Sequence, residues 1–343
     1  MLILLLIYFV TVFAGAKLNI KGNIDYLSIE NTQAIKGIFI LMVFYSHFNS
    51  YITLSGRFDE IYIKLFHTVG QAMVSMFLFY SGFGIMESIK RKGNMYIETI
   101  PKRRIFRTLI NFDFAVLIYL ALTLLLGSTP TISQTILSLI GIESLGNSNW
   151  YIFVILVLYL LTFTVFKLFS KMPNYISVFA LGISVCVLIL ITHRFSLKPT
   201  YWYDTALCYV FGAAYSLSRK YIEKILNKNI FIYITATFLS VTLYFVLINR
   251  RLFFSMAANL VFAAAIILIT MRVTLKNRIL VWCGDHLFEI YILQRIPMII
   301  FKKLGVNSVN TYLYFALCVA VTFGLSIVFR FATNKFWNKT AKS

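Results

Sequence analysis

Two ionisable residues, Lys36 and His47, lie in an apolar stretch near the start of the chain, IKGIFILMVFYSHF, residues 35–48. The stretch has the composition of a membrane-spanning helix, in which the eleven residues from Lys36 to His47 extend about 16 Å. An ionisable side chain within a membrane is costly, and it is by default a candidate for chemistry or transport. Since imidazole can act as a general base near neutral pH, His47 is the first candidate catalytic residue. The alternative is a packed histidine that is hydrogen-bonded to a neighbouring helix.

The segment FLFYSGFGI, residues 77–85, places Ser81 and Gly82 in the next predicted helix. Small residues let another backbone or a slender ligand approach closely, and on this segment alone helix–helix packing is the favoured interpretation. A basic loop follows at 89–107, and its Arg104 and Arg107 are three residues apart, which predicts that they face the same way. Paired guanidiniums at a membrane surface suit a phosphate-bearing ligand. Alternatively, the loop only marks the cytoplasmic side.

Three carboxylates lie within apolar segments. Asp113 lies near the inner end of its predicted helix and is expected to pair with Arg107 or Lys36. Asp285 and Glu289 are four residues apart and hence share a helix face. A metal site is conceivable there, but a buried ion-pair network with the arginines is the favoured interpretation. The four cysteines form no CxxC pair and have no nearby histidine at zinc spacing, so neither a disulfide framework nor a metal site is indicated.

The composition requires a membrane environment for these residues. The 343-residue chain is 60% hydrophobic and 13% charged, with a mean hydropathy of +0.82. A soluble protein of this size could not bury so much apolar surface, so we predict an all-α, polytopic transmembrane bundle. The net charge of +20 would suggest nucleic acid binding in a soluble protein. Here it is better explained by basic cytoplasmic loops, and no nucleic acid partner is predicted.

A membrane span needs about 20 mostly apolar residues, and the hydropathy pattern predicts eleven spans. The first lacks the basic start of a signal peptide, so we expect it to be a retained helix although its AGA resembles a cleavage site. The span at 203–218 is short, and the apolar stretch 131–142 is too short to cross and is expected at the interface. The predicted spans are 2–18, 34–54, 66–88, 108–126, 150–170, 175–193, 203–218, 230–248, 253–271, 279–301 and 311–331.

The distribution of lysine and arginine predicts the orientation of these spans. If the basic loop 89–107 is cytoplasmic, alternation puts 23 basic residues inside and eight outside. The N-terminus is then outside and the C-terminus cytoplasmic, with Lys36 near the cytoplasmic mouth of its helix and His47 in the outer half. No sequence repeat of the kind that marks inverted-repeat transporters is visible.

In order, spacing and topology these segments together resemble the acyltransferase-3 family of membrane acyltransferases, which acylate cell-surface sugars. The family pattern is Arg or Lys, ten residues and then His on one helix, an SGF-like motif on the next, and a cytoplasmic RxxR. Here these are Lys36 with His47, Ser81-Gly82-Phe83, and Arg104 with Arg107. The resemblance covers about residues 30–331 and implies a ten-helix core with one additional N-terminal helix.

Later segments resemble the family less closely. Trp150, with Asn149 before it, matches a tryptophan at an outer helix start, but the glutamate that often follows is missing. FEIYILQ, residues 288–294, ends in Gln294 where the family commonly has histidine, and the usual proline after RxxR is missing. These departures indicate a divergent branch. His67, at an outer helix end, is a further candidate for the acceptor side, and Asp113, Asp285, Glu289 and Gln294 are candidate supporting residues.

The resemblance implies an O-acyltransferase with acetyl-CoA, or another acyl-CoA, as donor substrate and no bound cofactor. The coenzyme A phosphates would bind Lys36, Arg103, Arg104 and Arg107, and the pantetheine arm would pass Ser81, Gly82 and Phe83. His47 would act as general base or accept the acyl group transiently. The acceptor would be a surface or capsular polysaccharide, or its lipid-linked precursor, outside a bacterial plasma membrane.

Two other classes stay open from the sequence. A transporter or flippase of a lipid-linked sugar would also have many spans, buried charges and an aromatic outer rim, and a structural subunit of a polysaccharide machine would tolerate substitution of His47. The expected organisation is an N-terminal helix and linker at 1–30, the acyltransferase domain at 31–331, and a cytoplasmic tail at 332–343.

Overall fold

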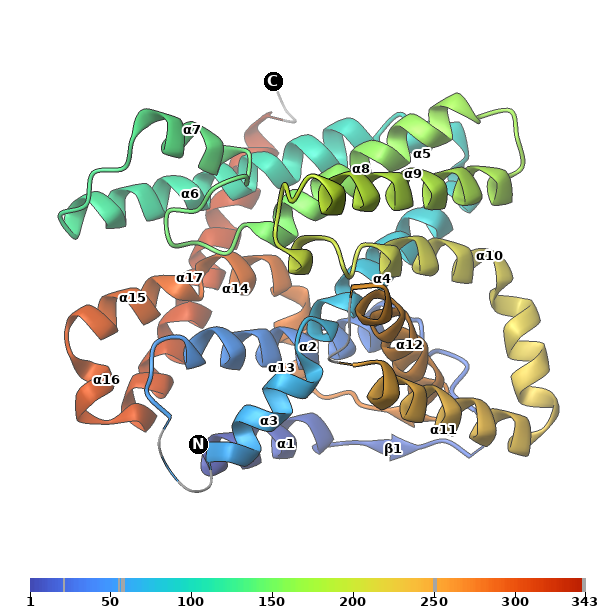
Figure 1. The fold of residues 1–343 in the computed structure, drawn as a ribbon, viewed down its shortest axis with the longest axis horizontal. Coiled ribbons are helices and arrows are strands. Elements are labelled where there is room, and N and C mark those ends of the chain that lie inside the picture. The colour runs from blue at the N-terminus through green and yellow to red at the C-terminus, as the bar shows by residue number, and fades with distance from the viewer. Residues whose placement is uncertain (21, 55, 57–58, 249–251, 341–343) are drawn as a thin grey trace.

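The protein is a bundle of helices (Figure 1), and the computed structural model describes residues 1–20, 22–54, 56, 59–248 and 252–340. The all-α prediction is confirmed. The first part of the chain forms α1 (Leu2–Phe13), β1 (Lys17–Leu18), α2 (Ile29–Asn49), α3 (Asp59–Val69), α4 (Ala72–Lys92), α5 (Asn94–Ile97), the π-helix η1 (Pro101–Phe106), α6 (Arg107–Leu125), α7 (Ile132–Leu139), α8 (Trp150–Leu168) and α9 (Asn174–Arg194).

The second part of the chain completes the bundle and returns to its beginning. It forms η2 (Thr200–Trp202), α10 (Leu207–Lys228), α11 (Ile230–Leu247), α12 (Leu252–Thr270), β2 (Val273–Thr274), α13 (Arg278–Asp285), α14 (Leu287–Leu293), α15 (Arg295–Lys303), α16 (Val306–Val309) and α17 (Thr311–Thr340). The two short strands pair antiparallel, so the linker after α1 lies beside the linker after α12.

Seven helices among the described residues are long and apolar enough to cross a membrane: α4, the continuous stretch Asn94–Leu125, α8, α9, α11, α12 and α17. Two more, α2 and α10, have 21 and 22 residues but include polar ends. The prediction of a multi-pass membrane protein is therefore confirmed. Residues 332–340 of the predicted tail continue α17 as helix.

The predicted first span, 2–18, is shorter in the structure. The helix α1 has 12 residues, about 18 Å, against about 30 Å for the hydrocarbon core of a bilayer. It ends because the chain turns at Gly15, whose φ of 82° lies in the left-handed region. The Tyr45 hydroxyl donates to the carbonyl of Leu4, and the Tyr8 hydroxyl to that of Ile38, so α1 lies antiparallel along α2.

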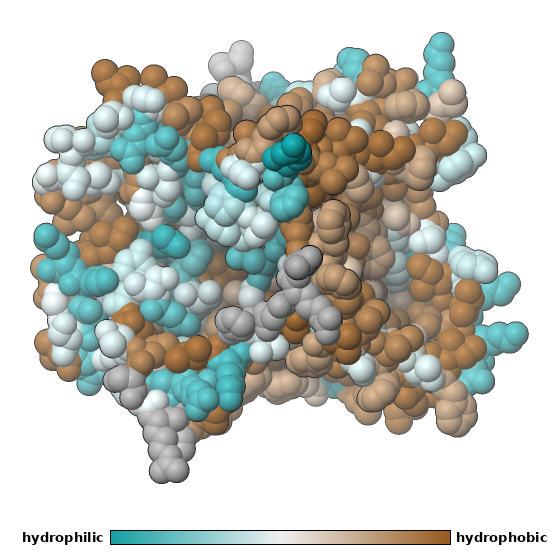
Figure 2. All heavy atoms as spheres, in the orientation of Figure 1, coloured by the Kyte–Doolittle hydropathy of each residue, from teal (hydrophilic) through white to brown (hydrophobic). Residues whose placement is uncertain are grey.

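The outer surface suits contact with lipid. In Figure 1 the helices α6, α8 and α9 run across the upper half, and α2 and α11 run across the lower half. Figure 2 shows hydrophobic residues gathered over the centre and right of this face and hydrophilic residues gathered at the left. Large apolar side chains such as Phe179 on α9 and Phe238 on α11 are each 71% exposed. A bilayer would cover these side chains.

The predicted span 279–301 is not one helix but three, α13, α14 and α15, with breaks at His286 and Gln294. Pro297 contributes to the second break because it has no backbone N–H to donate to the carbonyl four residues earlier, that of Leu293. Irregular backbone at membrane depth is tolerated where protein buries it. Both break residues are buried, with His286 9% exposed and Gln294 fully covered.

Glycines let two pairs of helices cross with their backbones in contact. A Cβ on Gly37 of α2 would lie 1.9 Å from the carbonyl oxygen of Leu280 on α13, and a Cβ on Gly284 would lie 1.8 Å from that of Gln33. The helices α4 and α10 cross in the same way. A Cβ on Gly82 would meet the carbonyl oxygen of Tyr209, and a Cβ on Gly212 would meet that of Phe79. Such close crossings are typical of membrane helices, whose interfaces favour small residues. They fix α2 and α4, which carry the predicted site.

Candidate active site

His47 lies on α2 beside a cavity of about 60 Å³, and its imidazole is half-buried. Its Nδ1 is 3.5 Å from the Oγ of Ser148, and its ring centroid is 6.3 Å from that of Tyr291 on α14. The cavity is also lined by Trp150 at the start of α8 and by Gly70 and Gln71 between α3 and α4. His47 therefore borders an open space, as a catalytic base requires. We refer to this end of the bundle as the His47 end, and to the opposite end as the Lys36 end.

The loop before α8 positions Ser148, a residue that the sequence did not single out. The side-chain amide of Asn149 donates to the carbonyls of Gly141 and Glu143, at 2.9 Å each, and so folds the loop back on itself. Asn149 is thus engaged by its own loop, whereas Trp150 lines the cavity. That these two residues lie on the acceptor side stays a prediction. His67 lies in α3, and its side chain is outside the described part of the structure.

The second break in the α13–α15 segment brings Arg295 to the same place. Its positive charge acts on His47, and its guanidinium interacts with the hydroxyl of Tyr51. Gln294 points the other way: its amide donates to the carbonyl of Tyr291 at 3.0 Å, within the fold. Gln294 therefore supports the break. Arg295 is the site residue that the sequence pattern missed, since its proximity to His47 depends on a turn that hydropathy does not reveal.

At the Lys36 end, two of the predicted donor-binding cations lie close together. The Lys36 Nζ is 5.6 Å from the centroid of the Tyr80 ring, and the charge of Arg104 acts on Lys36. The Arg104 Nε donates to the Tyr96 hydroxyl at 3.2 Å. Like charges brought together destabilise each other, and the carboxylate of Asp285, which also acts on Lys36, offsets part of this repulsion. The charge of Arg104 has the larger effect on Lys36, so the pair is suited to bind a further anion.

The prediction that Arg104 and Arg107 face the same way is wrong. Arg107 lies against α17, with its guanidinium carbon 5.7 Å from the centroid of the Trp337 ring. The cause is the π-helical segment η1, in which the Arg107 N–H bonds the carbonyl of Lys102, five residues earlier. The wider turn changes the angle between side chains three apart, and such turns are frequent at functional sites. Arg103 is exposed on the same segment.

The residues of the SGF motif lie on two different faces of α4. The backbone of α10 at Tyr209 leaves no room for a side chain at Gly82, and Phe83 is buried, with its ring 6.4 Å from that of Tyr215 on α10. Both residues therefore pack against the α10 side, the role favoured for Gly82 on this segment alone. Ser81 faces α8 instead, where its hydroxyl interacts with those of Tyr151 and Tyr159.

A row of hydroxyl-bearing side chains lies between the two ends of the bundle. At one end, Arg104 interacts electrostatically with Tyr159. Ser81 interacts with the hydroxyls of Tyr159 and Tyr151. From Tyr151 onward the contacts are between rings, with Tyr151 5.5 Å from Tyr291 and Tyr291 6.3 Å from His47. Polar groups are expensive inside a membrane protein unless they have partners or a ligand. The row follows the α4–α8 interface from the basic end to the histidine.

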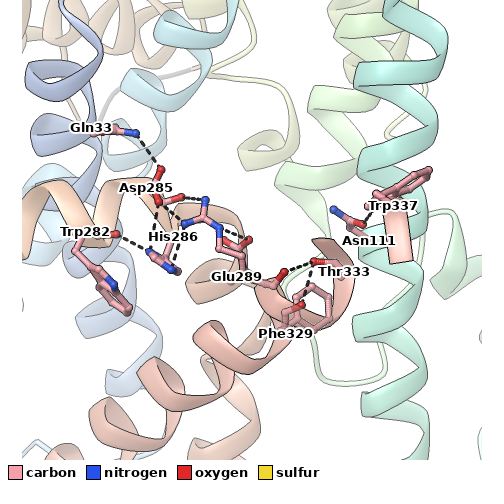
Figure 3. Close-up of polar contacts among 10 residues, drawn as sticks. Gln33, Asn111, Trp282, Asp285, His286, Glu289, Phe329, Thr333 and Trp337 are labelled. Atoms are coloured by element: carbon pink, nitrogen blue, oxygen red, sulfur yellow. Dashed lines mark hydrogen bonds and ion pairs between the residues drawn. The ribbon is translucent and has the colours of Figure 1, made fainter. Parts of the chain in front are cut away.

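The predicted ion-pair network of Asp285 and Glu289 is confirmed, and its arginine is Arg330 of α17. The network is buried at Glu289 but not at Asp285, whose side chain is 43% exposed. Arg330 pairs with Asp285, and its Nε is 3.5 Å from Glu289 Oε1. Figure 3 shows Gln33 directed toward Asp285, which it contacts at 3.0 Å, with His286 on the other side. This network fastens α13 and α14 to α2 and α17 near Lys36, on which Asp285 also acts.

Asp113 does not pair with Arg107 or Lys36, contrary to expectation. Among the described residues its Oδ1 is buried without a hydrogen-bond partner, and no ion pair involves it. The reason is that Arg107 lies over Trp337 and Lys36 over Tyr80. The structure therefore brings together Lys36 with Arg104, and Ser148, Trp150 and Arg295 with His47. It leaves Asp113 outside both groups.

Comparison with protein families finds one domain family that matches most of the chain. A family model described as an acyltransferase domain matches residues 29–331, from the start of α2 to within α17. Searches of curated proteins and of solved structures return no significant match. The matched range contains the Lys36 pair, the row of hydroxyls and the His47 cavity.

Proposed function

The chain belongs to the acyltransferase-3 family of integral-membrane acyltransferases, and from this premise we propose that it is an O-acyltransferase. It moves an acetyl or other acyl group from acyl-CoA to a hydroxyl of a cell-surface or capsular polysaccharide, or of its lipid-linked precursor. The observation that carries this proposal is the row of hydroxyls between Arg104 and His47. It begins at a cationic anchor, Arg104, and leads through Tyr159, Ser81 and Tyr151 to aromatic contacts beside a candidate base, His47.

The donor enters at the Lys36 end in this proposal. Coenzyme A is multiply anionic, and Lys36 and Arg104 offer it two cations in each other's field. The slender pantetheine arm, which has amide groups, follows Ser81, Tyr159 and Tyr151 along the α4–α8 interface. Arg103 and Arg107 are exposed on η1 and α6, as Arg104 is, and contribute further attraction from the surface.

The reaction takes place beside His47. As a general base, its imidazole takes the proton of the acceptor hydroxyl while that oxygen attacks the thioester carbonyl; the C–S bond then breaks and the thiolate takes the proton back. Alternatively, the imidazole itself attacks the thioester and passes the acyl group to the hydroxyl in a second step. In either case negative charge develops on the carbonyl oxygen, and Arg295 is placed to stabilise it.

The acceptor approaches from the His47 end, which the charge distribution puts outside the cytoplasm. Trp150 lines the cavity there, and an aromatic ring offers a surface on which a sugar can stack. With donor and acceptor entering from opposite ends, the acyl group crosses the bacterial plasma membrane without movement of coenzyme A.

Replacement of His47 tests this function. In His47→Ala, O-acetylation of surface polysaccharide, measured by mass spectrometry, should be lost while membrane expression is retained. The matched control is His193→Ala, because His193 is a histidine at the same end, bonded to the Tyr203 hydroxyl at 3.1 Å. Labelled acetyl-CoA separates the classes: an acyltransferase transfers the label to saccharide, whereas a flippase does not. Unchanged acetylation in His47→Ala removes His47 from the mechanism.

A further inference from the structure

A second cavity, of about 250 Å³, adjoins the His47 cavity. The two share Gly70 and Gln71, the turn between α3 and α4, as a common wall. The larger cavity lies where the chain enters α10, α11 ends and α12 begins, and its lining includes Asp204, Tyr244 and Asn259. None of these residues belongs to a motif that indicated the function.

Asp204 lines this cavity with an incompletely satisfied carboxylate. Its side chain is 6% exposed, and its Oδ2 accepts a hydrogen bond from the Ser255 hydroxyl at 3.2 Å. Its Oδ1 is buried and has no hydrogen-bond partner of good geometry among the described residues, and only the backbone N–H groups of Asp204 and Thr205 also act on the carboxylate. A buried carboxylate oxygen without a donor is costly, because water no longer solvates it. The Asn259 amide contacts only the backbone carbonyl of Asp204, at 3.2 Å, so it does not satisfy this oxygen.

The charge of the cavity indicates the chemistry of its ligand. Among the described residues that line it, there is a carboxylate and there is no lysine, arginine or histidine. The Asp204 carboxylate, when ionised, itself repels a phosphate or another anion, in contrast to the cations of the Lys36 end. A group with several O–H donors would supply the missing hydrogen bond, because a carboxylate oxygen accepts hydrogen bonds. At about 250 Å³ the cavity takes roughly eight waters at about 30 Å³ each, which is room for a sugar unit rather than for one water.

We propose that this cavity is the acceptor subsite and that it binds a sugar unit through its hydroxyls. One hydroxyl donates to Asp204 Oδ1. A second hydroxyl of the same saccharide reaches past Gly70 and Gln71 to His47. Asp204 touches the acceptor and selects neutral, hydroxyl-rich groups. This inference rests on the proposed acyltransferase function and adds to it the residue that recognises the acceptor.

The test uses membranes that contain the full-length protein, labelled acetyl-CoA, and surface polysaccharide from the same cells after removal of its esters with base. In Asp204→Asn we expect the apparent KM for the polysaccharide to rise about 10- to 100-fold, the range for loss of a charge-assisted hydrogen bond. The apparent KM for acetyl-CoA should stay unchanged. Asp25→Asn is the matched control, because Asp25 is an exposed aspartate in the linker before α2; both of its KM values should equal those of the wild type.

A second variant tests the cavity without altering the carboxylate. Ala258, 3% exposed, lines the same space, so Ala258→Leu should fill it and raise the KM for polysaccharide alone. If wild type transfers label and Asp204→Asn has the same KM for polysaccharide, the subsite is wrong and the acyltransferase function stands. If both KM values of Asp204→Asn change together, Asp204 is structural and the subsite is also wrong. If wild type transfers no label to saccharide, the proposed function fails, and this inference fails with it.

Discussion

At the Lys36 end of the bundle, the positive charges of Lys36 and Arg104 repel each other. Arg104 also contacts Tyr96 and acts on Tyr159, which begins the row of hydroxyls toward His47. Arg107, three residues later, is turned away by η1 and lies over Trp337. At the scale of single residues, the two arginines of the RxxR motif therefore differ in what they can bind.

The two arginines should differ in the same way in kinetics. Arg104→Gln removes a cation that faces the proposed donor path, so we expect the KM for acetyl-CoA to rise about tenfold or more, the loss of one charge-assisted contact. Arg107→Gln should raise it less. The KM for polysaccharide should not move in either variant. Equal effects of the two substitutions on the donor KM would contradict the orientation that η1 gives them.

The elements that carry the site are held by backbone contact at glycines. Each of α2 and α4 crosses a later helix at a glycine pair, and no side chain larger than hydrogen fits at Gly82 or Gly37. In a bilayer, where lipid is as apolar as leucine, close packing replaces the hydrophobic effect as the force between helices. The positions of Lys36, His47 and Ser81 therefore depend on these crossings.

Alanine substitutions on α4 test the crossing directly. A Cβ at Gly82 would meet the Tyr209 carbonyl oxygen at 1.9 Å, so Gly82→Ala should lower the free energy of unfolding by about 1–3 kcal/mol, as overpacking does. Gly84 is two residues away on the same helix, and a methyl group added there would have nothing within 4 Å, so Gly84→Ala is the matched control. Thermal midpoints in detergent measure both. An equal midpoint for the two variants would show that the α4–α10 crossing is looser than described.

At the scale of the whole molecule, the two ends of the bundle differ in charge and in the ligand that they suit. The Lys36 end carries most of the lysines and arginines, and the His47 end carries the two adjoining cavities. From the positive-inside rule we expect the bundle to lie with Lys36 toward the cytoplasm. In the proposed function this orientation lets a cytoplasmic donor and an external acceptor meet at His47.

Cysteine labelling in intact cells measures this orientation. Of the native cysteines, Cys186 is exposed and the other three are buried, so Cys186→Ser gives the background. Ser128→Cys, exposed in the loop after α6 at the His47 end, should react with a membrane-impermeant maleimide from outside. Lys171→Cys, exposed between α8 and α9 at the Lys36 end, should react only after lysis. The reverse pattern would place His47 on the cytoplasmic side.

Much of the fold and part of the site can be predicted because they depend on local sequence. Hydropathy summed over 20 residues defines a span wherever it occurs, and the spacing of Lys36 and His47 is fixed by the rise of one helix. The spacing of Asp285 and Glu289 is enough to predict that they share an ion-pair network. The breaks at His286 and Gln294 escape such a prediction, because the segment 279–301 is apolar enough to resemble a continuous helix.

Local sequence is enough to specify an all-α membrane protein in which one helix carries a lysine and, eleven residues later, a histidine. The surroundings of that histidine depend on the tertiary fold. Ser148 and Tyr291 lie more than 100 residues from His47 in the chain, and they reach it through a folded loop and a broken helix. Arg104 and Arg107 separate because of a π turn, and Asp204 reaches the neighbouring cavity by the packing of four helix ends. Contacts between distant segments follow from packing, which no local pattern of residues specifies.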